Sequence, residues 1–386
     1  MIDPVRFITL LEEAGIGLFV GVPDSLMQSL SSALEAHVPS TRHLVAANEG
    51  NAVATAMGHV LASGRPALVY LQNSGLGNTV NPLLSLVDPE VYGVPMVLLI
   101  GWRGEPGVPD EPQHIKQGGV TLAMLDAMEV PWQELHAGLE DVGALVHRAV
   151  DQAVRRKGPV AIVVRKGAFG PSARDARVST TSDAPSREEA LALVAGTIPT
   201  GALVVSTTGM LSRELFELRV KAGGGDALDL LTVGGMGHAS SIALGAALAD
   251  SDREVWCLDG DGALLMHMGA LAVIARSAGP RFHHVVFNNG VHDSVGGQPT
   301  AIDIVDVPAL ARAAGYSWSG RATSLDHLAR ALPGVAAEGP ALLEIVVRPG
   351  NRPDLGRPTR TPRESRVRLE RALRGTGSDT ADEDVA

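Results

Sequence analysis

The stretch EVWCLDGDGALLMHMGALAVIARSAGPRFHHVVFNNGVHDSVGGQPT, residues 254–300, decides the fold of this chain. Two short apolar runs in it, Glu254–Leu258 and His283–Phe287, end at polar turns that contain glycine, GDG after the first and NNG after the second. Residues 263–278 between the runs have helical spacing. A strand, helix and strand of this length form a crossover between parallel strands, so we expect both turns at one edge of a sheet.

The two turns carry groups suited to a metal and a diphosphate. Gly260 and Gly262 flank Asp261 and allow a phosphate to approach the backbone, while the amides of the following helical turn favour an anion. Mg²⁺ prefers one or two protein oxygens together with phosphate oxygens, and Asp261 and Asn289 supply such oxygens. Each motif alone is most simply a turn, whereas the pair at this spacing predicts a metal-diphosphate site.

Composition limits the class of protein. The 386 residues, 45% of them hydrophobic, suffice for two domains, and only 3% are aromatic, which indicates cores of Ala, Val and Leu as in buried parallel strands. The single cysteine, Cys257, lies in an apolar run and is expected in the core. The net charge of −11 argues against a nucleic-acid surface. We expect no membrane segment and a cytoplasmic location.

The alternation of strands and helices occurs twice along the chain. We therefore predict an α/β protein with two doubly wound parallel-sheet domains and no middle domain. The first domain is expected at residues 1–170 and the second at 187–355. Residues 171–186 are polar and rich in Pro and Ser, as a linker would be, and 356–386 are expected to form a C-terminal helix and a disordered tail.

Polar turns also follow the strands of the first half. Asp24 and Ser25 come after an apolar run and either cap the helix expected at 26–34 or belong to a site. Glu49 stands where a strand meets an Ala-rich helix, and is either a partner of the helix dipole or a catalytic group.

Two glycine-rich segments of the first half are expected to be loops. One is QNSGLGN at 72–78, and the other is the long segment 101–119, which carries Arg103 and His114 together with other polar residues. Long irregular segments inside compact domains are often binding loops or lids. We therefore expect ligand contacts from both.

Seven segments, considered together, resemble the thiamine diphosphate-dependent 2-oxoacid decarboxylases. The resemblance extends over roughly residues 1–350 and implies a pyrimidine-binding domain followed by a pyrophosphate-binding domain. The segments are GVPDSL (21–26), AANEGNA (46–52), QNSGLGN (72–78), DEPQHIKQGG (110–119), GGMGHASSIALG (234–245), DGDGALLMHMG (259–269) and NNGVHDSVGGQPT (288–300).

The resemblance implies thiamine diphosphate and Mg²⁺ as cofactors. It assigns to Glu49 the hydrogen bond to the pyrimidine ring and to Met236 a place under the bent cofactor. The implied metal ligands are Asp261, Asn289 and the carbonyl of Val291. The implied cofactor-binding residues are Glu49, Thr208, Gly234, Met236, Gly260, Asp261, Gly262, Ala263, Asn289 and Ser294.

Within the family the likeness is strongest to the members that decarboxylate phosphonopyruvate to phosphonoacetaldehyde and carbon dioxide in phosphonate biosynthesis. Sulfopyruvate is the alternative substrate, and a non-catalytic cofactor-binding subunit is a further alternative, which would be expected to lack Glu49, Asp261 or Asn289. The resemblance also implies a homo-oligomer with active sites between subunits. The expected catalytic residues are Glu49, His114 and His292. The expected substrate-binding residues are Ser25, His114, Lys116 and Gln117, and Ser294 is a further candidate.

Overall fold

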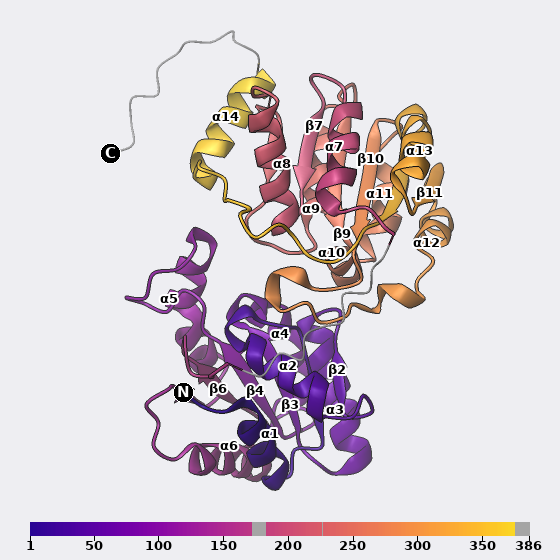
Figure 1. The fold of residues 1–386 in the computed structure, drawn as a ribbon. Helices are drawn as coiled ribbons and strands as arrows, with labels where there is room; N and C mark the ends of the chain where they lie inside the picture. Colours follow the sequence, from indigo (N-terminus) through magenta and orange to yellow (C-terminus); the bar gives the residue numbers. More distant parts are fainter. Residues whose placement is uncertain (172–182, 226, 375–386) are drawn as a thin grey trace. The chain divides into compact units, whose positions relative to one another are not determined.

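The computed structural model describes residues 1–171, 183–225 and 227–374 of the chain (Figure 1). These residues form two compact units. The chain up to residue 171 groups with His292–Thr300 in the first unit, and the other described residues form the second. Most of the predicted linker and the predicted tail from residue 375 lie outside the described ranges. The domain boundaries expected from the sequence remain predictions.

The first unit is built on a parallel sheet of six strands in the order β2-β1-β3-β4-β6-β5. Helices cover both of its faces (Figure 1). The strands are β1 (Leu18–Gly21), β2 (His43–Val45), β3 (Ala67–Gln72), β4 (Met96–Gly101), β5 (Trp132–Leu135) and β6 (Pro159–Val164). The α-helices are α1 (Pro4–Glu13), α2 (Gln28–His37), α3 (Glu49–Ser63), α4 (Leu76–Pro82), α5 (Pro112–Ala127) and α6 (Val142–Arg156).

Local sequence signals account for the ends of these helices. The Asp3 side chain accepts a hydrogen bond from the Val5 amide at the start of α1, and Asn48 caps α3 in the same way. Gly64 ends α3 in the left-handed conformation, with φ of +70°. Helices α1, α2 and α6 pack on one face of the sheet, and α3, α4 and α5 on the other.

The second unit repeats this architecture. Its six parallel strands have the order β11-β12-β10-β9-β7-β8. The strands are β7 (Leu203–Ser206), β8 (Asp229–Leu231), β9 (Val255–Gly260), β10 (Phe282–Asn288), β11 (Trp318–Ala322) and β12 (Ala341–Val346). The α-helices are α7 (Arg187–Thr197), α8 (Met210–Lys221), α9 (Ala239–Ala249), α10 (Asp261–Met266), α11 (Ala270–Ser277), α12 (Val307–Ala314), α13 (Leu325–Ala337) and α14 (Pro362–Arg374).

The two sheets have one connectivity. Numbered along each unit, both sheets read second, first, third, fourth, sixth and fifth strand from edge to edge. The predicted fold class, two doubly wound parallel-sheet domains without a middle domain, is thereby confirmed. Strands β9 and β10 are neighbours, as the sequence predicted. Strands β5, β8 and β11 had not been expected.

Three local predictions were wrong. The helix expected at 263–278 is broken into α10 and α11 around residues 267–269. The loop expected at 72–78 is helical, formed by η2 (Asn73–Gly75) and the start of α4. The long loop expected at 101–119 ends at residue 111, where α5 begins.

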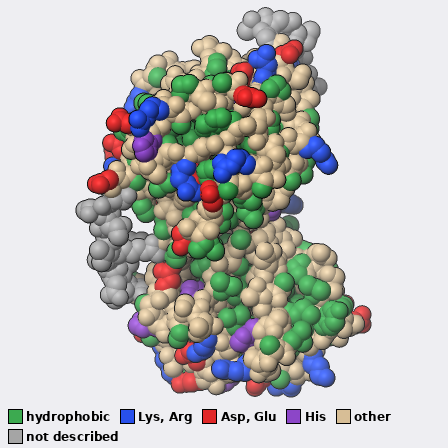
Figure 2. All heavy atoms as spheres, turned by 90° about the vertical axis from the view of Figure 1, so that its right-hand side faces the viewer, with side chains coloured by type: hydrophobic (Ala, Val, Ile, Leu, Met, Phe, Trp, Pro, Cys, Tyr) green, Lys and Arg blue, Asp and Glu red, His purple; other side chains and the backbone are tan. Residues whose placement is uncertain are grey.

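The surface carries mixed charges. On the face drawn in Figure 2, Lys and Arg side chains are interspersed with Asp and Glu and form no single basic patch. Among the residues that the structure describes, no helix combines the length and the apolar character needed to cross a membrane.

Candidate active site

Asp261 and Asn289 lie at the carboxyl ends of two paired strands of the second unit. Strands β9 and β10 run parallel with Gly260 opposite Phe287, so the residues that follow them emerge at the same edge of the sheet. Asp261 is the first residue of α10 and is 3% exposed. The Asn289 Oδ1 atom accepts a hydrogen bond from the Val291 amide at 3.1 Å. This edge is where doubly wound sheets bind ligands.

A glycine-rich loop that precedes α9 packs against α10. Gly237 has φ of +83°, and a Cβ atom added to it would lie 2.6 Å from His267 Cδ2 and 3.0 Å from the Ala263 carbonyl oxygen. Only glycine therefore allows this contact. The close approach of Gly237 to Ala263 and His267 places the loop beside α10. The half-buried Met236 directly precedes Gly237 in this loop.

The donors at this edge suit a metal-bound diphosphate. The Asp261 carboxylate, the Asn289 side-chain oxygen and the Val291 carbonyl are hard oxygen donors of the kind that Mg²⁺ prefers. The backbone at Gly260 is open, because an added Cβ would meet only the Thr207 Cγ2 atom at 3.9 Å. The residues present thus fit Mg²⁺ with thiamine diphosphate, and their individual roles remain predictions.

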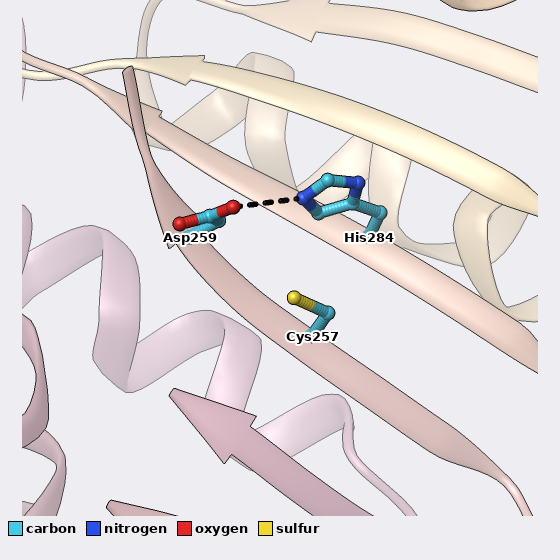
Figure 3. Close-up of side chains that lie close together, drawn as sticks. All are labelled: Cys257, Asp259 and His284. Carbon is cyan, nitrogen blue, oxygen red and sulfur yellow. Dashed lines mark hydrogen bonds and ion pairs between the residues drawn. The ribbon is translucent and has the colours of Figure 1, made fainter. Parts of the chain in front are cut away.

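A second group of potential metal ligands, Cys257, Asp259 and His284, lies within the sheet of the second unit (Figure 3). The His284 Nε2 atom lies 3.4 Å from Asp259 Oδ2, and its Nδ1 atom lies 3.3 Å from the Tyr316 hydroxyl. The Gly260 amide donates to Asp259 Oδ1 at 2.9 Å. Burial, followed by the Asp259 charge, raises the pKa of the Cys257 thiol. Because the imidazole and carboxylate already have protein partners, we interpret this group as an internal hydrogen-bond network.

Glu49 is held at the start of α3 in the first unit. Its side chain is 6% exposed, and Asn78 Nδ2 donates a hydrogen bond to Glu49 Oε2 at 2.8 Å. A Cβ atom on Gly75 would lie only 2.2 Å from Glu49 Oε1. The glycine-rich segment 72–78 therefore makes room for this carboxylate and orients it.

Asp24 is a buried carboxylate at the end of β1. Its side chain is 0% exposed, and a Cβ atom on Gly101 would lie 1.7 Å from Asp24 Oδ2. Among the described residues, neither carboxylate oxygen has a hydrogen-bond partner, and the side chain does not cap the following helix. Burial raises the pKa of Asp24 to about 6. The nearby Leu26 amide, which does not reach hydrogen-bond geometry, and the Arg103 charge offset part of this rise. Asp24 occupies the N-cap position of η1 (Ser25–Met27), but its side chain makes no capping hydrogen bond there.

Arg103 lies near Asp24 and is fixed by three neighbours. Its Nε and Nη2 atoms donate to the two carboxylate oxygens of Asp110 at 2.8 and 2.5 Å, and its Nη1 atom donates to Ser25 Oγ at 2.7 Å. The Asn73 side chain bonds both the amide and the carbonyl of the Arg103 backbone. The hydrogen bond from Arg103 lowers the pKa of Asp110 to about 2. Ser25 thus belongs to this cluster, and its role in substrate binding remains a prediction.

The polar residues predicted on the segment 110–119 lie on helix α5. His114 is 9% exposed, and its Nδ1 atom has no hydrogen-bond partner among the described residues. Burial lowers the pKa of His114, and the Arg103 charge lowers it further. Lys116 is exposed and Gln117 is half-buried. Since residues turn by about 100° along a helix, Lys116 lies on a different face of α5 from His114.

His292 and Ser294 follow the NNG turn, in the segment that groups with the first unit. His292 is half-buried, and burial lowers its pKa to about 4. Its amide donates to the Gln298 carbonyl at 2.8 Å. Ser294 is exposed. The roles predicted for these two residues remain predictions.

Two family profiles match the chain. The thiamine pyrophosphate enzyme N-terminal TPP binding domain matches residues 6–128, and the C-terminal TPP binding domain of the same enzymes matches residues 208–345. The first of these matches lies in the first unit, and the second lies in the second unit except for His292–Thr300, which groups with the first unit. The fold and the two matched domains together define the class as a thiamine pyrophosphate enzyme.

Three curated relatives match the chain over most of its length. Phosphonopyruvate decarboxylase of Streptomyces viridochromogenes is 39% identical over 94% of this chain and 93% of that protein. Phosphonopyruvate decarboxylase of Streptomyces hygroscopicus is 36% identical over 94% and 92%. Sulfopyruvate decarboxylase of Methanosarcina acetivorans is 26% identical over 90% and 91%. The chain belongs to the thiamine diphosphate-dependent decarboxylase family that includes phosphonopyruvate decarboxylase.

The structure adds Asp110 to the candidates and brings it together with Asp24 and Arg103, which the sequence had already offered as possible site residues. The signal for Asp24 was present, since it follows a buried strand in the turn PDS. Its complete burial and its lack of a partner could not be predicted from the sequence. For Arg103 and Asp110, the sequence suggested a loop but gave no indication that the two side chains pair.

Proposed function

We propose that this chain decarboxylates 3-phosphonopyruvate non-oxidatively to phosphonoacetaldehyde and carbon dioxide, as a step of phosphonate biosynthesis. One observation carries the choice of substrate: two phosphonopyruvate decarboxylases are 39% and 36% identical to nearly the whole chain, against 26% for the sulfopyruvate decarboxylase. Sulfopyruvate remains the alternative substrate. Glu49, Asp261 and Asn289 are all present, which argues against a non-catalytic subunit.

In this proposal the second unit holds the cofactor. The oxygens of Asp261, Asn289 and Val291 bind Mg²⁺, and the amides of Gly262 and Ala263 face the diphosphate. When bound, thiamine diphosphate supplies a carbon nucleophile and an electron sink for the pair released with carbon dioxide. Met236 supports its bent form. Thr208, Gly234, Gly260 and Ser294 complete the proposed binding set.

The proposed role of Glu49 is to hold a proton at a fixed position. The hydrogen bond from Asn78 and the close approach of Gly75 orient its carboxyl group. A carboxyl group held in this way can share a proton with the aminopyrimidine ring of the cofactor. Glu49 is the residue whose replacement should abolish turnover while the chain still folds.

Substrate binding is assigned to the cluster around Arg103. Arg103 and His114 offer N–H donors to the anionic groups of the substrate, and Ser25 adds a hydroxyl. Replacing the lost carboxylate by hydrogen requires one proton. Asp24 has a pKa of about 6 and can exchange that proton near neutral pH. Lys116, Gln117 and His292 are proposed as further contacts.

The assembly is also part of the proposal. Residues 1–170 and 187–355 act as the pyrimidine-binding and pyrophosphate-binding domains of a cytoplasmic homo-oligomer. Its active sites are formed between subunits.

The test is release of carbon dioxide and aldehyde by the purified full chain, with and without thiamine diphosphate and Mg²⁺. We expect turnover of phosphonopyruvate only with both cofactors, and its loss in Glu49→Gln. The exposed Glu140 provides a matched control, since Glu140→Gln should keep full activity. Cofactor binding without turnover of phosphonopyruvate, sulfopyruvate or pyruvate would instead favour a non-catalytic subunit.

A further inference from the structure

Four adjacent strands of the second unit carry polar side chains near their carboxyl ends. They are Asp259 on β9, Asn288 on β10, Glu344 on β12 and Arg321 on β11. The register places Val286 opposite both Asp259 and Glu344, and Glu344 opposite Arg321. The rest of β12, ALLEIV, is apolar, and Glu344 is 1% exposed. A charge in such a place is costly unless it is paired.

Glu344 connects Arg321 to Asn288. Arg321 Nε donates to Glu344 Oε2 at 2.5 Å, and Asn288 Nδ2 donates to Glu344 Oε1 at 2.7 Å. Asn288 then accepts a hydrogen bond at Oδ1 from the Gly290 amide at 3.0 Å. A continuous set of hydrogen bonds thus runs from a partly exposed arginine, across three strands, to the turn after β10.

This turn contains Asn289 and Val291, the proposed metal ligands. Asn288 is fixed at its side chain by Glu344 and at its backbone by the Val347 amide, which donates to the Asn288 carbonyl at 2.8 Å. Gly290 has φ of +71°, so the turn needs a defined backbone conformation. Mutation of groups that orient metal ligands through hydrogen bonds typically lowers metal affinity or activity by about 10- to 100-fold.

We propose that Glu344 is a positioning residue for the Mg²⁺ loop of this chain. Paired with Arg321, it anchors the Asn288 side chain. Asn288 in turn fixes the backbone that presents Asn289 and Val291. This inference rests on the proposed function, because it requires that the loop bind the metal.

The competing interpretation is that Glu344 only stabilises the fold. The second unit contains another Arg-Glu pair, which serves as a control that distinguishes the two interpretations. Arg187 Nε donates to Glu214 Oε2 at 2.8 Å, and these side chains are 6% and 2% exposed. This pair joins helices α7 and α8 and is not a member of the hydrogen-bonded set that leads from Arg321 to the turn after β10. Both Glu344→Gln and Glu214→Gln remove the charge of a buried glutamate that pairs with an arginine. Only Glu344→Gln also removes the contact that anchors the loop.

The experiment measures Mg²⁺ binding to metal-free full-length protein by calorimetry in saturating thiamine diphosphate, together with the melting temperature without cofactors. We expect Glu344→Gln and Asn288→Ala to raise the Kd for Mg²⁺ by about 10-fold or more, with kcat at saturating Mg²⁺ changed much less. Glu214→Gln should lower the melting temperature and leave the Kd unchanged. Asn288→Asp keeps the acceptor for Gly290 but cannot donate to Glu344, so its Kd should also rise.

Each outcome decides the inference. If Asn288→Ala and Asn288→Asp bind Mg²⁺ as the wild type does, Glu344 is not a positioning residue, whether or not Glu344→Gln folds. The same conclusion follows if Glu214→Gln raises the Kd as much as Glu344→Gln. If the wild type itself does not bind Mg²⁺ with thiamine diphosphate, the proposed function fails first, which distinguishes the two failures.

Discussion

Replacing Asp24 by asparagine should stabilise the protein at neutral pH. Asp24 is completely buried and, among the described residues, its carboxylate has no hydrogen-bond partner. The charged form is therefore poorly compensated in the folded state. Asparagine has nearly the same shape and no charge, so Asp24→Asn removes the free-energy cost of burying a charged carboxylate. The same change removes the group proposed to exchange the proton during decarboxylation.

The size of the effect follows from the pKa. Folding raises the pKa of Asp24 from 3.8 to about 6. Because this shift is upward, the carboxyl group costs no stability below the unfolded pKa. The cost grows as the pH rises from about 4 to about 6 and is fully present above. At about 1.4 kcal/mol for each pKa unit, the total is about 3 kcal/mol, or roughly 6–12 °C in melting temperature for a domain of this size.

The assay is the melting temperature of Asp24→Asn and of the wild type between pH 4.5 and 7.5. The difference between the two proteins should increase with pH and level off above about pH 6.5, while decarboxylation is lost in the variant. Asp151 is exposed on α6 and provides the control, since Asp151→Asn should show no such trend. A difference for Asp24→Asn that is the same at every pH would refute the reasoning.

Three other changes have defined outcomes. Gly75→Ala should displace the Glu49 carboxylate, which lies 2.2 Å from the added Cβ position, and should lower activity at least tenfold. Gly77 has open space around it, so Gly77→Ala should stay fully active; equal activity of the two variants would contradict the role of Gly75. If active sites form between subunits, mixing the inactive Glu49→Gln and Asp261→Asn chains should restore activity, because one site of each mixed dimer then contains both unmutated residues. No recovery of activity after subunit exchange would place Glu49 and Asp261 of each site in the same chain. Removing divalent cations with EDTA should abolish turnover and Mg²⁺ should restore it, whereas full activity in EDTA would exclude the metal.

The sequence predicted the centre of the fold well because the central strands are buried on both faces. Strands β9 and β10 are continuous apolar runs that stop at GDG and NNG, so both their pairing and the meeting of the two turns could be expected. Strands β5, β8 and β11 are short or half-buried and lie at or near the sheet edges. Such strands lack a continuous apolar run, which is why they were missed.

Glycine was the main source of error in the first unit. Gly118 lies inside α5, where a Cβ atom would come within 1.7 Å of the Gly104 carbonyl oxygen. Gly75 makes room for Glu49 in the same way. In both places glycine permits close packing of a helical segment, but in the sequence it looks like a loop signal.

The candidate site was predictable only where a motif defines it. Asp261 and Asn289 were found from their spacing, and Glu49 from the family resemblance. The environment of Asp24 depends on the close approach of Gly101 across the sheet. No local pattern in the sequence encodes such a long-range contact.

The most direct test of the central claim compares kcat/KM for phosphonopyruvate and for sulfopyruvate, measured with the same purified protein, thiamine diphosphate and Mg²⁺. The account predicts a clear preference for phosphonopyruvate, with no turnover of either acid by Glu49→Gln. A higher kcat/KM for sulfopyruvate would contradict the proposed substrate while leaving the cofactor site intact.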